Sequence, residues 1–73
     1  MIKNATFTSV WDGGYEITTN CKVNMKTKEV FDIEASIGTE DLVNDLNYEY
    51  ITIDGENYFV SYNGEENTEY WYE

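Results

Sequence analysis

The sequence of 73 residues predicts a mainly β fold, at the border of the α+β class. Two observations support this fold class: apolar and polar residues alternate with a period of two along several segments, and strong turn signals separate those segments. We expect an antiparallel meander of five or six strands with one short helix near residues 40–46. Either a partly open barrel or a sheet laid over the helix fits this pattern. The length allows one domain, residues 1–73.

The clearest alternation runs over residues 15–25, where every second position, including Cys21 and Val23, belongs to one face. Such a run is typical of a half-buried strand. An Asp-Gly-Gly turn signal at residues 12–14 joins it to a preceding β-rich segment. We therefore expect a hairpin whose first strand places three side chains on the core face: Ala5, Phe7 and Trp11.

A second hairpin is predicted around residues 24–29, with Lys28 in the left-handed conformation that glycine usually occupies. The strand after it, residues 30–37, alternates apolar and polar positions. Its expected core face consists of Phe31, Ile33, Ala35 and Ile37. Gly38 then ends the strand. Thr39 can cap a helix over residues 40–46, whose apolar stripe would be Leu42, Val43 and Leu46.

A third hairpin is predicted at Asp54-Gly55, between two aromatic segments at residues 48–53 and 58–62. Residues 65–73 are expected to form either an edge strand through Tyr70-Trp71-Tyr72 or a loose acidic tail. Alternation places rings on both faces of residues 48–62. Some of these rings must therefore cover the helix or a second layer, or form an exposed aromatic patch.

The residue inventory argues against an enzyme. The chain has no His, no Arg and a single cysteine, Cys21, which excludes the commonest general base, a bidentate phosphate clamp and an internal disulfide. Cys21 is expected to be a buried small hydrophobe, and the carboxylates of Asp32 and Glu34 to be solvated. No nucleotide, metal or nucleophile motif is present, so we expect no catalytic residue, no metal and no cofactor.

No apolar run is long enough for a signal peptide or a membrane-spanning helix. A lone thiol is typical of proteins in a reducing compartment. We therefore expect a cytoplasmic bacterial protein that makes no contact with membranes.

The distribution of charge is the most informative feature. Residues 1–37 carry five acids and four lysines, a net charge of −1, whereas residues 38–73 carry ten acids and no base, a net charge of −10. The second part also holds eight of the twelve aromatic residues. The plain interpretation is that the acids keep the protein in solution. The sharper one is an acidic, aromatic surface for a basic partner, because aromatic side chains dominate the energetics of interfaces.

We therefore predict a non-enzymatic protein-interaction module that binds a basic protein surface. The alternative is a nucleic-acid mimic that inhibits a DNA- or RNA-handling enzyme, since acids on one strand face repeat at about 6.6 Å. Direct binding of nucleic acid is not expected at a net charge of −11. The chain should be a monomer or a weak homodimer through its C-terminal edge strand. The residues expected to bind the partner are Glu49, Glu56, Glu65, Glu66, Glu69, Tyr70, Trp71 and Tyr72.

Overall fold

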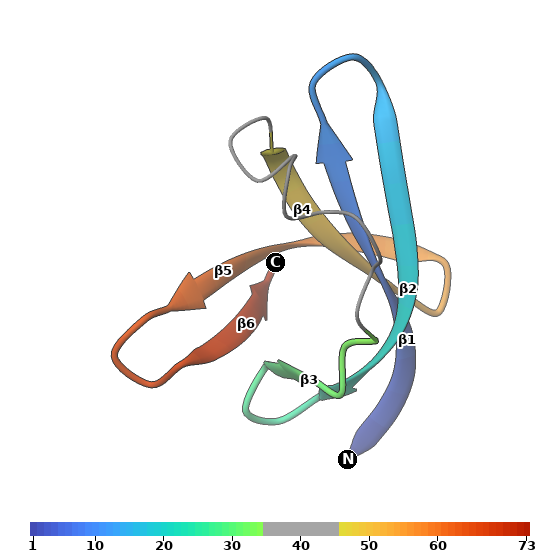
Figure 1. Cartoon of the computed structure of the whole chain (residues 1–73). Helices are drawn as coiled ribbons and strands as arrows, with labels where there is room; N and C mark the ends of the chain where they lie inside the picture. The colour runs from blue at the N-terminus through green and yellow to red at the C-terminus, as the bar shows by residue number, and fades with distance from the viewer. Residues whose placement is uncertain (35–45) are drawn as a thin grey trace.

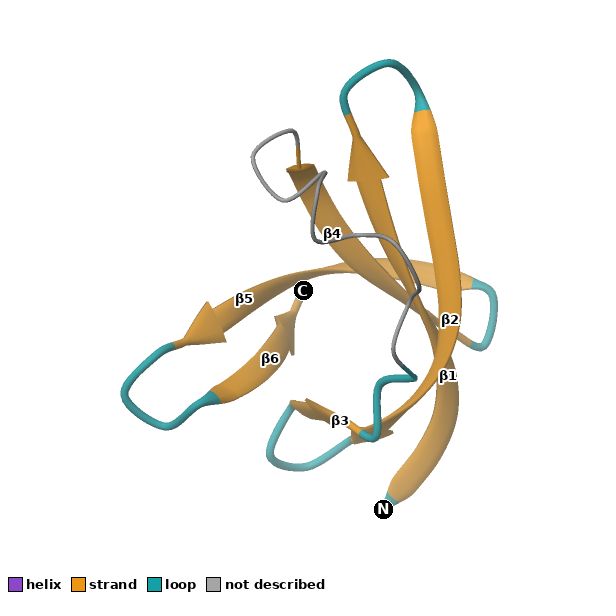
Figure 2. Cartoon of the chain, viewed as in Figure 1, coloured by secondary structure: helices purple, strands orange, loops and turns teal. Residues whose placement is uncertain are grey.

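The computed structural model describes residues 1–34 and 46–73, and these residues form a closed antiparallel barrel of six strands (Figures 1 and 2). The order around the barrel is β1-β2-β3-β6-β5-β4. The strands are β1 (Ile2–Trp11), β2 (Tyr15–Asn24), β3 (Glu29–Phe31), β4 (Leu46–Ile53), β5 (Glu56–Asn63) and β6 (Thr68–Tyr72). The mainly β prediction is confirmed, and the barrel is closed rather than partly open.

The first hairpin is confirmed. Trp11 pairs with Tyr15 across the turn, and Gly13 and Gly14 both have φ of +87°, a conformation that side-chain-bearing residues rarely adopt. The expected core face is also correct: Ala5, Phe7 and Trp11 are buried, as are Cys21 and Val23 on β2. Near the turn the same face of β2 opens to solvent, because Tyr15 lies beyond the rest of the barrel and is 64% exposed.

The second hairpin is confirmed in its loop. The side-chain oxygen of Asn24 accepts hydrogen bonds from the backbone N–H groups of Lys26 and Thr27, at 2.8 and 3.0 Å. Lys28 has a φ of +71°, the left-handed conformation that was expected. Asn24 therefore provides the hydrogen-bond acceptor for two backbone N–H groups of the turn, and Lys28 adopts its strained left-handed conformation.

The expected face and length of the third strand are wrong. Val30, not Phe31, faces the core: it lies opposite Val23 on β2 and is 4% exposed, whereas Phe31 is partly exposed. The strand ends at Phe31 because Asp32 has a φ of +51°, outside the extended region. Ile33, also expected in the core, is exposed. The expected core residues Ala35 and Ile37 lie outside the described residues.

The third hairpin is confirmed as a two-residue turn. Ile53 pairs with Glu56, and both Asp54 and Gly55 have positive φ, at +51° and +85°. This is the type I′ geometry that Asp-Gly favours. The helix expected over residues 40–46 lies outside the described residues except for Leu46, which is instead the first residue of β4.

The C-terminal segment forms the expected strand through Tyr70, Trp71 and Tyr72, but this strand does not lie at an edge of the sheet. β6 pairs with β5 on one side and with β3 on the other, so both of its edges are occupied. A homodimer formed by extending the sheet at β6 therefore has no free edge to use. Closure at β6 is coupled to packing, since Trp71 is buried in the core with 2% exposure.

The core occupies the middle of the barrel and the end next to the Asp54-Gly55 turn. Ile51 and Val23 are fully buried at its centre. The other members of this cluster are Ala5, Phe7, Cys21, Val30, Ile53 and Trp71. Inward positions outside this cluster include the polar residues Ser9, Thr19, Glu49 and Glu69, and also Trp11, which is buried next to the β1–β2 turn. Part of the interior is therefore polar.

Candidate functional site

The residues predicted to bind a partner are divided between the two sides of the barrel wall. Glu49, Glu69 and Trp71 point inward, because they lie in register with the buried positions Ile51 and Val30. They cannot contribute directly to an outer contact surface. Glu56, Glu65, Glu66 and Tyr72 are exposed, and Tyr70 is partly exposed. Along β6, the inward residues Glu69 and Trp71 thus alternate with the outward residues Tyr70 and Tyr72.

Two carboxyl groups lie in the polar part of the interior. Glu49 on β4 is opposite Ser9 on β1, whose hydroxyl donates a hydrogen bond of 3.3 Å to Glu49 Oε2. Oε2 of Glu69 is buried and has no hydrogen-bond partner within the described residues. Burial raises the pKa of both groups; for Glu69, burial together with the negative charge of Glu49 raises it from 4.5 to about 7. In the sequence, the inward direction of Glu49 is indicated by period-two alternation, which puts Glu49 on the same strand face as Ile51.

The single thiol belongs to this interior. Cys21 is buried, and burial, followed by the nearby charge of Glu69, raises its pKa to about 11. A thiol with so high a pKa has very little thiolate at neutral pH and is a poor nucleophile. The geometry supports the interpretation of Cys21 as a small core residue.

Four of the aromatic side chains on the outer side of β4, β5 and β6 form a group that we call the aromatic face: Tyr48, Tyr50, Phe59 and Tyr72. Phe59 lies opposite Tyr50 on one side and Tyr72 on the other, so the rings form a row across three strands. The centroids of Tyr48 and Tyr50 are 6.2 Å apart in a stacked arrangement, and Phe59 meets Tyr48 edge-on at 6.0 Å. Tyr72 lies 6.4 Å from Phe59. The predicted alternative of an exposed aromatic patch therefore describes this surface.

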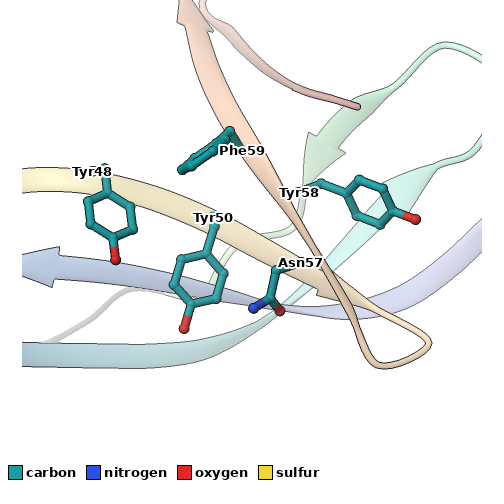
Figure 3. Close-up of a pocket in the computed structure, with 5 residues that line it drawn as sticks. All are labelled: Tyr48, Tyr50, Asn57, Tyr58 and Phe59. Atoms are coloured by element: carbon teal, nitrogen blue, oxygen red, sulfur yellow. The ribbon is translucent and has the colours of Figure 1, made fainter.

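Part of the aromatic face is hollowed. A depression of about 260 Å³ is lined by Tyr48, Tyr50, Asn57, Tyr58 and Phe59. Figure 3 shows Tyr48, Tyr50, Phe59 and Asn57 around this depression, while the ring of Tyr58 points away from it. Asn57 is held by the hydroxyl of Thr52, which donates to its side-chain oxygen at 2.7 Å. Sequence reasoning did not select Tyr48, Tyr50 or Phe59 as site residues, because alternation alone does not say which rings remain uncovered.

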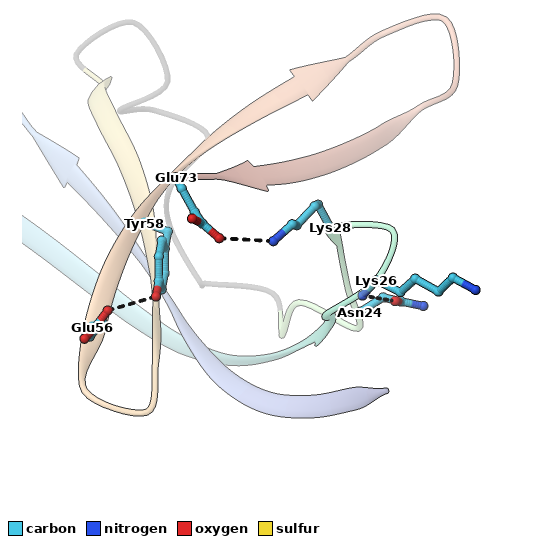
Figure 4. Close-up of polar contacts among 6 residues, drawn as sticks. All are labelled: Asn24, Lys26, Lys28, Glu56, Tyr58 and Glu73. Atoms are coloured by element: carbon cyan, nitrogen blue, oxygen red, sulfur yellow. Dashed lines mark hydrogen bonds and ion pairs between the residues drawn. The ribbon is translucent and has the colours of Figure 1, made fainter.

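The exposed acids lie at both ends of β5. Glu56 accepts a hydrogen bond of 2.9 Å from the hydroxyl of Tyr58 (Figure 4), and Glu66 accepts one of 3.1 Å from Tyr70. These hydrogen bonds to carboxylates raise the pKa of both tyrosines, which therefore remain donors at neutral pH. Glu65 is exposed in the β5–β6 turn. The acids thus border the aromatic face rather than interrupt it.

Most of the positive charge is already neutralised. Three of the four lysines form ion pairs: Lys3 with Asp54 at 2.6 Å, Lys22 with Asp32 at 3.7 Å, and Lys28 with Glu73 at 3.3 Å. Figure 4 shows the Lys28–Glu73 pair. The same Lys28 Nζ lies 3.9 Å from the ring centroid of Trp71. Within residues 1–34 and 46–73, these pairs leave a surface dominated by carboxylates.

Over the part of the chain that the structure describes, no three side chains of His, Cys, Asp or Glu come together as a metal site would require. Over the same residues, no helix has the length and apolar character needed to cross a bilayer. Comparison with protein-family models, with curated proteins and with solved structures found no match for this chain.

Proposed function

We propose that this protein is a non-enzymatic interaction module that binds a basic protein surface through the aromatic face and the acids that border it. The observation that carries this proposal is the row of rings across β4, β5 and β6. Tyr48, Phe59 and Tyr72 are 48%, 55% and 50% exposed although each has an aromatic neighbour. Contiguous exposed rings are the composition that protein interfaces favour at their centre.

Charge supports a basic partner rather than a second copy of the chain. The net charge is −11, and three lysines are engaged in ion pairs within the molecule. A second copy would bring an equal negative charge against the first, whereas a basic surface would be attracted and its approach accelerated. As part of this proposal, the protein acts as a monomer in the bacterial cytosol, where its lone thiol stays reduced.

Mimicry of nucleic acid remains the alternative, and the described strands offer it less support. It requires carboxylates repeated along one outer strand face at about the phosphate spacing. The outward positions of β5 between Glu56 and Glu65 are Asn57, Phe59, Ser61 and Asn63, so this strand presents rings and amides there. The aromatic face therefore fits contact with a protein better than replacement of a nucleic-acid backbone.

The proposal is tested by calorimetric titration with a short synthetic peptide in which lysine and arginine alternate with glycine. We expect binding that weakens severalfold between about 50 mM and 300 mM salt, because screening reduces attraction between exposed charges. The double variant Phe59→Ser, Tyr72→Ser should lose binding, and Glu65→Gln, Glu66→Gln should reduce its salt dependence.

The matched control is Tyr15→Ser, which removes another exposed ring, at the β1–β2 turn, and should bind as the original chain does. Equal binding by the aromatic-face variant and by the original chain would refute the proposal. Competition by duplex DNA for a partner later captured from host lysate would favour mimicry.

A further inference from the structure

We propose that the depression between Tyr48, Tyr50 and Phe59 is a subsite for one arginine side chain of the basic partner. This inference rests on the proposed function, and it names the chemical group that the aromatic face recognises. It also places that group at one position on β4 and β5.

The ring arrangement suits a flat cation. Tyr48 and Tyr50 are stacked with an interplanar angle of 29°, and Phe59 stands nearly perpendicular to Tyr48 at 74°. The depression therefore has neighbouring ring faces on one side and a further ring on the other (Figure 3). The faces of aromatic rings carry negative potential and attract cations within about 6 Å of the centroid.

The depression has room for one side chain of a partner. Its volume of about 260 Å³ is below the range of roughly 300–1,000 Å³ typical of sites for small-molecule ligands. A guanidinium group and part of its aliphatic stem need less space than a cofactor. The subsite would therefore hold a side chain that the partner projects from its own surface.

The molecule already contains one contact of the same kind. The ammonium group of Lys28 lies 3.9 Å from the ring centroid of Trp71, and Tyr58 packs against the same ring at 4.8 Å. That cation comes from the chain itself and is also paired with Glu73. The Tyr and Phe rings of the aromatic face can attract a cation through the same interaction. At a net charge of −11, a cation from outside is the occupant that the field of the protein favours.

Hydrogen bonding favours arginine over lysine. The hydroxyls of Tyr58, Tyr62 and Tyr70 donate to Glu or Asn oxygen atoms, whereas within the described residues those of Tyr48 and Tyr50 form no such bond. A phenol oxygen can accept from the N–H groups that fan out in the guanidinium plane. Guanidinium is also flat and more weakly hydrated than ammonium, so it stacks on rings at a smaller desolvation cost.

The test compares three synthetic peptides of the same length that differ only at their basic positions: arginine, lysine, or the neutral isostere citrulline. Binding is measured by titration while ring signals of the aromatic residues are followed by NMR. We expect the arginine peptide to bind at least about fivefold more tightly than the lysine peptide, and the citrulline peptide to bind at least about tenfold more weakly than the arginine peptide. Signals of Tyr48, Tyr50 and Phe59 should shift.

Variants locate the subsite. Phe59→Ser and Tyr48→Ser should each weaken binding of the arginine peptide by about tenfold, whereas Tyr48→Phe keeps the ring and should weaken it only about twofold. Tyr15→Ser is the matched control and should leave the affinity unchanged. The folded state of each variant is checked by its NMR spectrum, and Tyr48→Phe keeps the test informative if Tyr48→Ser fails to fold.

The outcomes separate this inference from the proposed function. Equal affinity for the arginine and lysine peptides, with shifts at Glu65 and Glu66 but not at the rings, would overturn the subsite and leave a basic-partner module intact. Failure of every basic peptide to bind would overturn both. Self-association that buries Phe59, seen as ring shifts that grow with protein concentration, would also overturn both and identify a second copy as the occupant.

Discussion

The inward and outward sides of β4, β5 and β6 both carry aromatic rings, but these rings have opposite roles. Inside, Ile51 and Trp71 are buried in the core, and Glu69 is held among neighbours that raise its pKa to about 7. Outside, Phe59 and Tyr72 are about half exposed, and their ring centroids lie 6.4 Å apart. The residue type alone therefore does not show whether an aromatic or acidic side chain of this protein is buried or exposed. Its side of the barrel wall decides whether it contributes to stability or is available to a partner.

The largest expected effect is at the centre of the inward side. Ile51→Ala should lower the free energy of unfolding by about 3 kcal/mol, because it leaves a cavity at a position with no exposure. Urea unfolding monitored by tryptophan fluorescence measures this loss. If the variant does not fold, Ile51→Val should still cost about 1 kcal/mol. A loss below about 0.5 kcal/mol for Ile51→Ala would contradict a packed interior at this position.

The next effect concerns the buried acid. The pKa of Glu69 is raised in the folded protein, so the folded state binds the proton more tightly than the unfolded state does. Stability from this group is present below about pH 4.5 and is lost as the pH rises through about 7. The protein should therefore be more stable at pH 5 than at pH 8.

Glu69→Gln tests the same group directly. It should raise the free energy of unfolding at pH 8 by about 2 kcal/mol and reduce the pH dependence, since the amide carries no charge to desolvate. Glu65→Gln, at an exposed turn position, is the control and should change stability by less than about 0.5 kcal/mol. Thermal unfolding across pH 5 to 8 gives both results. An unchanged pH profile in Glu69→Gln would show that Glu69 is not the responsible group.

A smaller effect on stability is expected at the Asp54-Gly55 turn, which joins β4 and β5, the strands that carry three of the four rings of the aromatic face. Gly55 has a φ of +85°, and a Cβ there would meet no atom within 4 Å. Gly55→Ala should thus cost about 1 kcal/mol, all of it from backbone strain. Chemical denaturation provides the measurement. No loss of stability would mean that the turn can change type while keeping Tyr50 opposite Phe59.

The smallest effect on stability is expected on the outward side. Phe59→Ser should lower the free energy of unfolding by less than about 1 kcal/mol, because the ring is 55% exposed and its contacts are with other exposed rings. The same variant should weaken peptide binding about tenfold, as expected for the subsite. A stability loss as large as that of Ile51→Ala would show that Phe59 belongs to the core and is not primarily a contact residue.

Much of the local structure could be predicted from the sequence because it depends on neighbouring residues. Asp-Gly at positions 54 and 55 favours the type I′ geometry, and Lys28 was expected at positive φ from the loop pattern. The assignment of Val30 failed because an apolar pair, Val30-Phe31, fits either phase of a strand. The pairing of Val30 with Val23 then decided the face.

The site was harder to predict than the fold. Alternation showed that rings lie on both faces of β4 and β5, but it could not show which face a helix or another strand would cover. Trp71 was expected at an exposed edge and lies in the core, since β3 and β5 both pair with β6. The β3–β6 pairing joins segments far apart in the sequence, so no local pattern indicates it.

The sequence by itself therefore determined most of the strands, their tight turns and the concentration of acids and rings in the second part of the chain, because these follow from period, turn chemistry and composition. Only the tertiary structure decided that the sheet closes, through the β1–β4 and β3–β6 pairings. Closure gives every strand one inner and one outer side. It turns Glu49, Glu69 and Trp71 inward and leaves Tyr48, Phe59 and Tyr72 in solvent, since successive side chains of a strand point to opposite faces.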